Sequence, residues 1–375
     1  MTFSMHVSQK GRANNEKSVS LQVIIYIMYI MGMFRDILRC SVAVILFAVQ
    51  LTMVSCGDTL SGSQKPGSSG GTLDVLLAID EEVYSGSVKE LIDSIFLQPQ
   101  RALPQPEPRF DLVPIPVSSL RNTSMFQHYR NIVICDVRKG NPDKVYRSMD
   151  PWAEPQIVYE FSVADEATLC RLLRKTTDRL VDDIYNAEHR RMIKAYKGIE
   201  GYAVEAAVKK QLGISLTISN EFEVARPDNP RPDFMWVRKE TKDFGIGVQI
   251  HVLPYDDPAV FTEERVLDTL EYQMRMHIPG IADGSYMNIE RRLPFYTRQV
   301  TISDSLYAVE TRGCWRTEGA FMGGPFVNYV VLSPDQQKVV FLTAYVYYPS
   351  GRLKSLTKRD LLMQVEGICH SLRFE

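Results

Sequence analysis

The stretch that decides the fold is Leu306–Gly319, which reads L-Y-A-V-E-T-R-G-C-W-R-T-E-G, and it is followed at once by Phe321–Phe326, F-M-G-G-P-F. The first run alternates in character, as a strand does when successive side chains point to opposite faces of a sheet. One predicted face carries the charged residues Glu310, Arg312, Arg316 and Glu318. The glycines of the second run permit the backbone angles of a turn. We therefore predict a long strand followed by a turn.

Further strands and helices surround this stretch. Three neighbouring runs are rich in β-branched and aromatic residues and predict an antiparallel meander with it: Arg298–Ser303, Phe326–Leu332 and Val339–Tyr348. Shorter strands are predicted at Ser215–Ile218, Phe234–Arg238 and Ile246–Pro254. Apolar spacing predicts helices over Thr262–His277 and Leu356–Ser371, with Thr262 and either Ser355 or Thr357 as the caps.

The first half of the chain shows a second set of elements. Strands are predicted at Leu73–Ile79, Phe110–Ile115, Asn131–Val137 and Ile157–Val163. Helices are predicted at Val88–Phe96, Asp165–Lys197 and Val204–Leu212, the last ended by Gly213. Prolines 114 and 116 place the second strand at a sheet edge. The predicted fold class is α+β, with two antiparallel-sheet-plus-helices units at residues 73–209 and 210–375.

The dense stretch also predicts a binding surface. Its candidate residues are charged or aromatic and lie on the long strand, the turn and the last strand: Glu310, Arg312, Trp315, Arg316, Glu318, Phe321, Tyr345 and Tyr347. An exposed surface of this kind could bind sugar, peptide or anionic envelope material. The alternative is a solvated sheet face with cross-strand ion pairs, which needs no partner.

The N-terminal segment predicts export. A short positive region, Met33–Arg39, precedes an apolar run, Val42–Leu51, which is too short for a membrane span. The following Ser55-Cys56 resembles the bacterial lipobox, in which the cysteine is acylated and becomes the mature N-terminus. Two acyl chains would anchor the protein stably. Gly57 stands where the usual inner-membrane retention residue, Asp, would be, so we expect the outer membrane, with the body facing the periplasm or the surface.

The segments before and after this signal are interpreted separately. Leu21–Met33 is a second apolar run that no leader requires, so we expect translation to begin at Met31 or Met33. The alternative is that residues 21–54 form one or two membrane helices, although three charged residues interrupt the run. Residues 57–72 are rich in Gly and Ser and predict a flexible tether. Residues 1–56 are therefore interpreted as an extension plus signal peptide.

Composition excludes one class of partner. Residues 1–56 hold five basic and two acidic residues, which leaves 38 basic and 43 acidic residues and a net charge of −5 for the remainder. A mildly acidic body has no general attraction for phosphate backbones, so we expect no nucleic-acid partner.

The sequence shows little catalytic chemistry. It contains no G-x-S-x-G, H-E-x-x-H, Walker A or G-x-G-x-x-G motif and no C-x-x-C pair, so we expect no cofactor, no metal site and no catalytic residue. Cys135, Cys170 and Cys369 sit among apolar residues and are interpreted as buried thiols. Ser355 begins an S-x-x-K match that is better interpreted as a helix cap. His251 could meet Asp256-Asp257 in space, but a surface turn explains the two aspartates equally well.

Four short motifs carry a resemblance to a known family: Cys314–Glu318, Phe321–Phe326, Gly284–Met287 and Asp150–Gln156. Together they resemble an uncharacterised lipoprotein family of Bacteroidota, domain of unknown function 4837, over about Leu73–Phe374. The second half is also similar, by the order of its elements, to PsbP/Mog1-type sandwiches. The resemblance implies location and fold, and it offers no catalytic residues.

These observations lead to one functional hypothesis and one rival. We expect a lipid-anchored cell-envelope protein that binds or scaffolds an envelope protein or glycan and contacts the membrane through the lipid on Cys56. The rival is an envelope hydrolase that acts on a cell-wall or glycan substrate.

Overall fold

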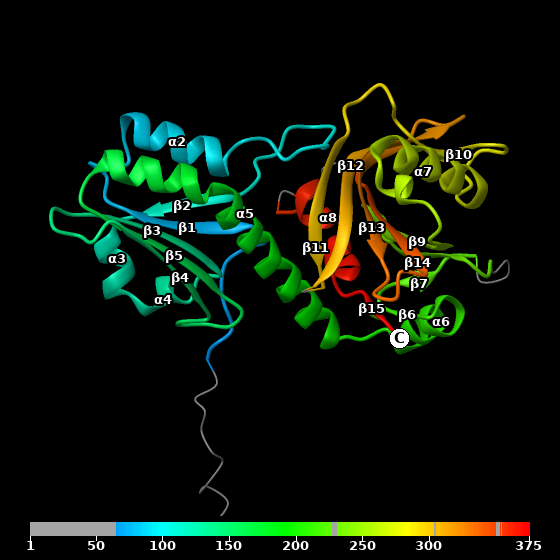
Figure 1. The fold of residues 1–375 in the computed structure, drawn as a ribbon, viewed down its shortest axis with the longest axis horizontal. Helices are drawn as coiled ribbons and strands as arrows, with labels where there is room; N and C mark the ends of the chain where they lie inside the picture. Colours follow the sequence, from blue (N-terminus) through cyan, green and yellow to red (C-terminus); the bar gives the residue numbers. More distant parts are fainter. Residues whose placement is uncertain (1–64, 227–230, 304, 350–352, 354) are drawn as a thin grey trace, which may run out of the picture. The chain divides into compact units, whose positions relative to one another are not determined.

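The computed structural model describes residues 65–375, except 227–230, 304, 350–352 and 354. The predicted signal segment, its cysteine and the first half of the predicted tether, residues 57–64, lie outside the described residues. Residues 65–375 form one compact unit. This unit contains two sheets, each with helices packed on it (Figure 1).

The first sheet has the strand order β2-β1-β3-β5-β4. Its strands are β1 (Asp74–Ile79), β2 (Asp111–Ile115), β3 (Asn131–Val137), β4 (Lys144–Met149) and β5 (Ile157–Val163). The pairs β1–β2, β1–β3 and β3–β5 are parallel, and only β4 runs antiparallel to its neighbour. The α+β class is confirmed, but the prediction that this sheet is antiparallel is wrong. The connections between parallel strands are long: those from β1 to β2 and from β2 to β3 contain helices, and the one from β3 to β5 contains β4.

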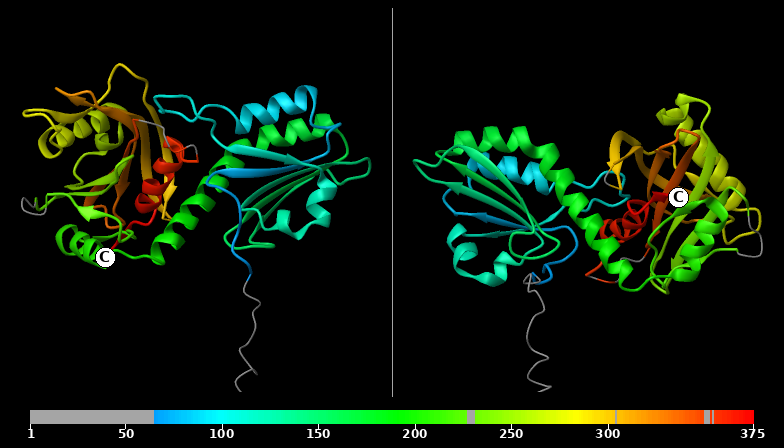
Figure 2. Two further views of the ribbon diagram at one scale, coloured as in Figure 1. Left: turned by 180° about the vertical axis from the view of Figure 1, so that it is seen from behind. Right: turned by 60° about the horizontal axis from the view of Figure 1, so that its bottom comes forward.

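Helices cover both faces of this sheet (Figures 1 and 2). They are α2 (Gly86–Phe96), α3 (Val117–Asn122), α4 (Ser124–Gln127) and α5 (Glu166–Lys197). α2 and α5 pack on one face, where Ile92 and Leu173 join the core with Leu77. α3 packs on the other face, where Leu120 meets Leu76. Burial on both sides explains why β1 is a continuous apolar run and does not alternate.

The second sheet is antiparallel and curled, in the order β10-β12-β13-β14-β9-β8-β7, with β11 also paired to β12. Its strands are β7 (Glu223–Val224), β8 (Phe234–Glu240), β9 (Gly245–Pro254), β10 (Tyr286–Ile289), β11 (Tyr296–Ile302), β12 (Leu306–Glu318), β13 (Gly323–Leu332) and β14 (Lys338–Tyr347). The predicted meander is confirmed by the β12–β13 and β13–β14 pairings. The predicted turn after β12 is shorter than expected, because Gly323 already pairs with Arg316 and begins β13.

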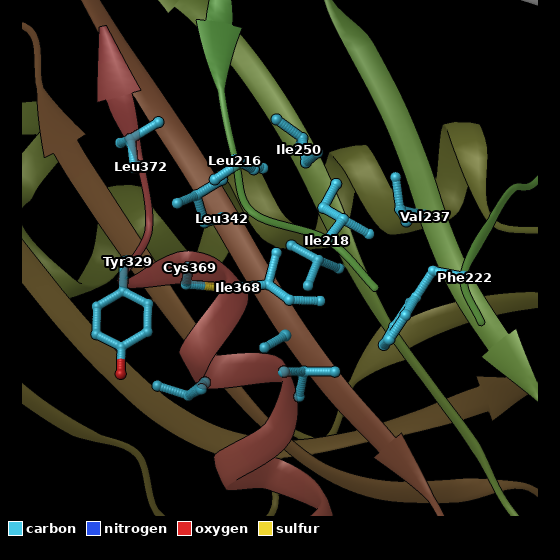
Figure 3. Packing of buried hydrophobic residues seen from close by; sticks show 14 of the residues in the cluster. Leu216, Ile218, Phe222, Val237, Ile250, Tyr329, Leu342, Ile368, Cys369 and Leu372 are labelled. Carbon is cyan, nitrogen blue, oxygen red and sulfur yellow. The ribbon is translucent and has the colours of Figure 1, made fainter. Parts of the chain in front are cut away.

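Helices cover both faces of this sheet as well. They are α6 (Tyr202–Leu212), the 3-10 helix η1 (Pro258–Phe261), α7 (Glu263–His277) and α8 (Lys358–Cys369), and a short pair of strands, β6 (Ile214–Ser215) and β15 (Arg373–Phe374), lies beside them. α8 packs on one face, where Ile368 and Cys369 lie beside Leu342 of β14 (Figure 3). α7 packs on the other face, where Leu270 meets Phe341. The sheet therefore has no fully solvated face, and charged residues such as Glu310 and Arg312 are buried under its helices.

The helix ends follow the predicted local chemistry. Asp165, Thr262 and Thr357 each accept a backbone hydrogen bond at the start of α5, α7 and α8. Thr357, and not Ser355, caps α8, where it forms a capping box with Asp360. Gly213 ends α6 with φ of 66°, a left-handed angle that glycine adopts without strain. The predicted domain boundary at residue 209 falls inside α6.

The segment 97–110, between α2 and β2, links the first sheet to the second. The carboxylate of Glu107 accepts hydrogen bonds from the backbone N–H groups of Lys358 and Arg359, at 3.1 and 2.8 Å. It thereby satisfies two free donors at the start of α8 and lies at the favourable end of the helix dipole. The guanidinium of Arg359 donates to the Pro108 carbonyl and to Asp111, at 2.7 and 2.6 Å.

α5 and α8 also pack directly against each other. A Cβ added at Gly367 of α8 would lie 2.5 Å from Cβ of Met192 of α5, so glycine is needed for this close approach. Met363 of α8 belongs to the same apolar cluster as the α5 core residues.

Candidate functional site

A buried charge cluster lies where α5, α8 and β12 meet. Arg312 is bidentate to two carboxylates at once: its guanidinium donates to Glu310 at 3.0 and 3.0 Å and to Glu366 at 2.9 and 2.8 Å. The hydroxyl of Tyr329 donates to Glu366 at 3.0 Å. All four side chains are buried. Bidentate guanidinium–carboxylate pairs are among the strongest hydrogen bonds in proteins, so we expect this cluster to be rigid.

Burial and ion pairing shift the pKa values of this cluster in opposite directions. Burial raises the pKa of Glu310, but Arg312 and Arg298 outweigh it and hold the pKa below its usual value. Burial likewise raises the pKa of Glu366, but Arg312 outweighs burial, and the pKa of Glu366 lies below its usual value. Burial opposes the charge on Arg312, yet the two carboxylates raise its pKa well above the usual value. The cluster is therefore ionised around neutral pH.

Two histidines border the charge cluster. The rings of His189 on α5 and His370 after α8 stack with centroids 3.6 Å apart. His189 Nε2 lies 3.4 Å from Glu366 Oε2. Burial, and then His189, lower the pKa of His370 well below its usual value. Three nitrogens of this pair, Nδ1 and Nε2 of His189 and Nε2 of His370, have no hydrogen-bond partner of good geometry among the described residues.

Two adjoining cavities, with volumes of about 400 and 410 Å³, border this cluster. Their shared lining residues are Asp182, Tyr185, Arg298, Glu310 and Arg312. The first cavity is further lined by Arg101 and Arg109 of the segment 97–110. Volumes of this size are typical of small-molecule sites.

Arg101 and Arg109 differ from the other arginines of the first cavity. Arg298 pairs with Asp182 and Glu310, both at 2.9 Å, and Arg312 is paired as described above. Neither Arg101 nor Arg109 forms an ion pair or a side-chain hydrogen bond with any residue that the structure describes. Arg101 stacks on the ring of Tyr296, 5.1 Å from its centroid.

The electrostatics around Arg109 favour an anion. Burial lowers the pKa of Arg109. Tyr185 acts in the opposite direction, and the positive charges of Arg101, Arg298 and Arg312 lower the pKa further. Asp178 lies at the rim of the same cavity, exposed to solvent. A bound carboxylate or phosphate would supply the missing partner for the two guanidinium groups, whose planar donors match such groups.

The segment that carries these arginines is held in place from several sides. Gln100 accepts a hydrogen bond from the Tyr185 hydroxyl of α5 at 2.6 Å. The backbone of the segment closes on itself through the Gln100 N–H to the Glu107 carbonyl, at 2.8 Å, and the Arg109 N–H to the Gln98 carbonyl, at 2.9 Å. The two guanidinium groups are therefore presented by an anchored loop.

The residues of the predicted binding surface do not form one exposed face. Glu310, Arg312, Trp315 and Tyr345 are buried, and the expectation that they are exposed is wrong. Glu310 and Arg312 lie under α8, whereas Trp315 and Tyr345 lie in the core on the opposite face. The indole of Trp315 donates to the Val346 carbonyl at 3.1 Å. The predicted alternation along the strand is right, but the alternation does not reveal which helix covers each face.

The other predicted surface residues lie at the far end of β12 or beside it. Arg316 is half-buried, pairs with Glu318 and has its Nε 3.6 Å from Glu290. Phe321 is fully exposed, and Tyr347 is half-buried beside Trp315. Of the predicted set, only Glu310 and Arg312 line the cavities described here. A binding role for the others stays a prediction.

Arg101 and Arg109 were not singled out from the sequence, although a signal for them exists. The segment 97–110 is long for a connection between a helix and a strand, and long connections in compact domains are often functional. Its prolines 104, 106 and 108 indicate an ordered course. Nothing local, however, indicates that the two arginines face a cavity.

The residues considered for catalysis have structural roles. His251 lies 3.1 Å from Asp233, not beside Asp256-Asp257. Asp257 caps η1, as the surface-turn interpretation predicts. The four cysteines of the described part of the chain, Cys135, Cys170, Cys314 and Cys369, are buried and free. Burial raises the pKa of the Cys135 thiol to about 12, which makes it unreactive.

Two kinds of feature are absent from the described ranges. No helix between residues 65 and 375, outside the gaps given above, is both long and apolar enough to cross a membrane. In the same ranges, no group of three or more His, Cys, Asp or Glu residues is arranged to hold a metal ion.

Two family models match the chain. Residues 202–371 match the model described as domain of unknown function (DUF4837). Residues 68–197 match a second model, also described as a domain of unknown function (DUF8532). The predicted family is thus confirmed for the second half, and the first half, including the motif at Asp150–Gln156, has a family model of its own. The lipoprotein and PsbP/Mog1 parts of the resemblance stay predictions.

Other comparisons add little. No curated protein matches the chain. One similar solved structure is the crystal structure of LpqN, described as involved in cell envelope biogenesis of Mycobacterium tuberculosis. It shares 15% sequence identity, with 42% of this chain and 79% of that chain covered and a TM-score of 0.24. A TM-score this low does not establish a shared fold.

Proposed function

We propose that this chain is a ligand-binding protein of the cell envelope, tethered by lipid on Cys56, whose ligand carries a carboxylate or phosphate group. The observation that carries the binding role is the pair Arg101 and Arg109. Both line a cavity of about 400 Å³, and neither has a carboxylate partner among the described residues. The envelope location rests on the sequence around Cys56.

The arrangement of charges supports binding over a purely structural role. A folded protein gains nothing from holding the half-buried Arg109 beside three other guanidinium groups, because burial and like charge both disfavour it. Unpaired charges of one sign in a cavity attract a ligand of the other sign. The carboxylates of Asp182 and Glu310 are already paired with Arg298 and Arg312, so these two groups do not neutralise Arg109 without rearrangement.

The surroundings support a preformed site. The paired cluster of Arg312 fixes the floor, and Glu107 fixes the loop that carries the two arginines. A preformed site loses less conformational entropy on binding than a mobile one.

One observation favours the rival, an envelope hydrolase. His189 lines the second cavity, and its Nε2 lies 3.4 Å from Glu366, as in an acid–base pair. The carboxylate of Glu366, however, is already bound by Arg312 and Tyr329. The binding role is therefore the better supported of the two.

The test is titration of the full-length protein, purified in detergent, with inorganic phosphate and with pyrophosphate by calorimetry. A charge-assisted hydrogen bond contributes about 1.5–3 kcal/mol, so Arg109→Gln should weaken binding roughly tenfold to a hundredfold. Arg174→Gln is the matched control, since Arg174 is exposed on α5 outside the cavity lining. The melting temperature of Arg109→Gln should be unchanged or higher than that of the wild type.

Two results would overturn the proposal. One is no measurable binding of either anion by the wild type. The other is an equal loss of affinity in the two variants, which would indicate a general effect of net charge. A lowered melting temperature of Arg109→Gln would instead assign the residue a structural role.

A further inference from the structure

Asp178 lies on the face of α5 that lines the first cavity. The α5 residues of this lining recur at the spacing of one helix face: Asp178, Val181, Asp182 and Tyr185. Asp178 is therefore on the same side of α5 as Asp182, which accepts a hydrogen bond from Arg298 at 2.9 Å. At 1.5 Å per residue, the two aspartates are about 6 Å apart along the helix axis.

Asp178 differs from the other carboxylates of the first cavity. Asp182 is paired with Arg298, and Glu310 is paired with both Arg298 and Arg312. Asp178 forms no ion pair and accepts no hydrogen bond from a side chain of the residues that the structure describes. The first cavity therefore has one unpaired carboxylate on its α5 wall.

The unpaired charges of the first cavity are thus of both signs. The guanidinium groups of Arg101 and Arg109 belong to the segment 97–110, and the carboxylate of Asp178 belongs to α5. Asp178 forms an ion pair with neither arginine, so the opposite charges are held apart within one cavity. Electrostatic complementarity favours a ligand with the reverse pattern, an anionic group at the arginines and a cationic group at Asp178.

The first cavity is larger than one anionic group requires. Its volume of about 400 Å³ is in the range of sites for whole small molecules. A ligand that fills it extends from the two arginines toward the α5 wall. An ammonium group suits that wall, because its three N–H donors match the acceptor oxygens of a carboxylate.

We propose that the ligand of the first cavity is a zwitterion, a small molecule with an ammonium group a few bonds away from a phosphate or carboxylate. The anionic group binds Arg101 and Arg109, and the ammonium group binds Asp178. Aminoalkyl phosphates and amino acids are two chemical classes with this pattern. This inference rests on the proposed function, because it names the ligand class of the same site.

The test uses two pairs of probes, and the members of each pair differ in the ammonium group. The phosphate pair is 2-aminoethyl phosphate and propyl phosphate, and the carboxylate pair is glutamate and glutarate. Each probe is titrated by calorimetry into the full-length protein in detergent, at a pH well above the second phosphate pKa of about 6. In at least one pair the amine should bind about tenfold more tightly, because its hydrogen bond to Asp178 is charge-assisted.

Two variants locate the groups that bind each end of the ligand. In Asp178→Asn, the two members of the pair should bind with equal affinity. The affinity of the amine-free probe should be unchanged or higher, since a negative charge has been removed from the cavity. Arg109→Gln should weaken the binding of both members.

The matched control for Asp178→Asn is Glu90→Gln. Glu90 is also an exposed acidic residue of a helix, but it lies on α2 outside the cavity lining. Glu90→Gln should leave the preference for the amine unaltered. The preference is a ratio of two affinities measured on one variant, so it does not depend on the fraction of protein that is folded.

The outcomes separate this inference from the proposed function. A preference in the phosphate pair alone assigns an aminoalkyl phosphate, and a preference in the carboxylate pair alone assigns an amino acid. Equal affinities within both pairs, with weaker binding in Arg109→Gln, would overturn the zwitterion while the anion site stands. A preference that survives in Asp178→Asn would also overturn the inference, because the ammonium group would then bind elsewhere. If neither these probes nor the inorganic anions bind, both proposals fail.

Discussion

The change Arg312→Met tests whether the buried charge cluster is a structural element of the fold. Methionine keeps much of the length and apolar surface of arginine but removes four hydrogen bonds, two to Glu310 and two to Glu366. Glu310 and Glu366 then face each other in the interior without a cation between them, although Arg298 still reaches Glu310 at 2.9 Å.

The expected cost follows from burial. The side chain of Arg312 is 8% exposed, and those of its two partners are 5% and 2% exposed. Removing one partner of a buried ion pair costs about 3–5 kcal/mol, because the remaining charge stays desolvated. Arg291 provides the matched control: it also pairs with two carboxylates, Asp268 and Glu271, but its side chain is 43% exposed. Arg291→Met should cost about 0–1 kcal/mol.

The assay is urea unfolding of the full-length chain, followed by the fluorescence of its three tryptophans. Glu366→Gln tests whether the change in unfolding free energy reverses its sign between two backgrounds. In the wild type it should destabilise, because it weakens the binding of Arg312. In the Arg312→Met background it should stabilise, because it removes one of the uncompensated charges. The reasoning is refuted if Arg312→Met loses no more stability than Arg291→Met, or if Glu366→Gln destabilises both backgrounds.

Three further predictions concern pH, the surface pair and the anchor. Burial, and then His189, hold the pKa of His370 well below its usual value of 6.5, so the unfolded chain gains a proton that the folded chain does not. The free energy of unfolding should therefore fall as pH drops below about 6.5, by up to about 1.4 kcal/mol per pH unit for this group. The urea midpoint should depend less steeply on pH in His370→Phe than in the wild type. In the control His128→Phe, the pH dependence should be unaltered. Arg316→Ala removes a half-exposed ion pair and should change the unfolding free energy by about 0–1 kcal/mol; a loss of several kcal/mol would contradict this, and identical partners in pull-downs with the wild type would remove Arg316 from the predicted binding surface. Cys56→Ser should release the protein from membranes and leave an unprocessed precursor; fractionation like that of the wild type would contradict the lipoprotein prediction.

The sequence by itself determined the secondary structure of most of the chain. Local chemistry explains this success: Thr262 caps α7 with its own side chain, Gly213 ends α6 with its own backbone angle, and the alternation in Leu306–Gly319 marks a strand. Each of these signals acts over a few residues, so each can be read where it stands. Seven short elements of the described residues were not predicted: α3, α4, β4, β7, η1, β10 and β15.

Only the tertiary structure decided the strand order, the burial of charge and the candidate site. The sheet of the first half is mainly parallel because segments separated by whole helices or by another strand pair with each other, and no local pattern records that choice. Alternation placed Glu310 and Arg312 on one face of β12, but Glu366, more than fifty residues later, supplies the helix and the carboxylate that bury them. Arg101 and Arg109 belong to a segment far from β11 and β12 in the chain, and the docking of Glu107 on α8 brings them to the cavity. Burial and pairing depend on which segments meet in space, and that information is spread over the whole chain.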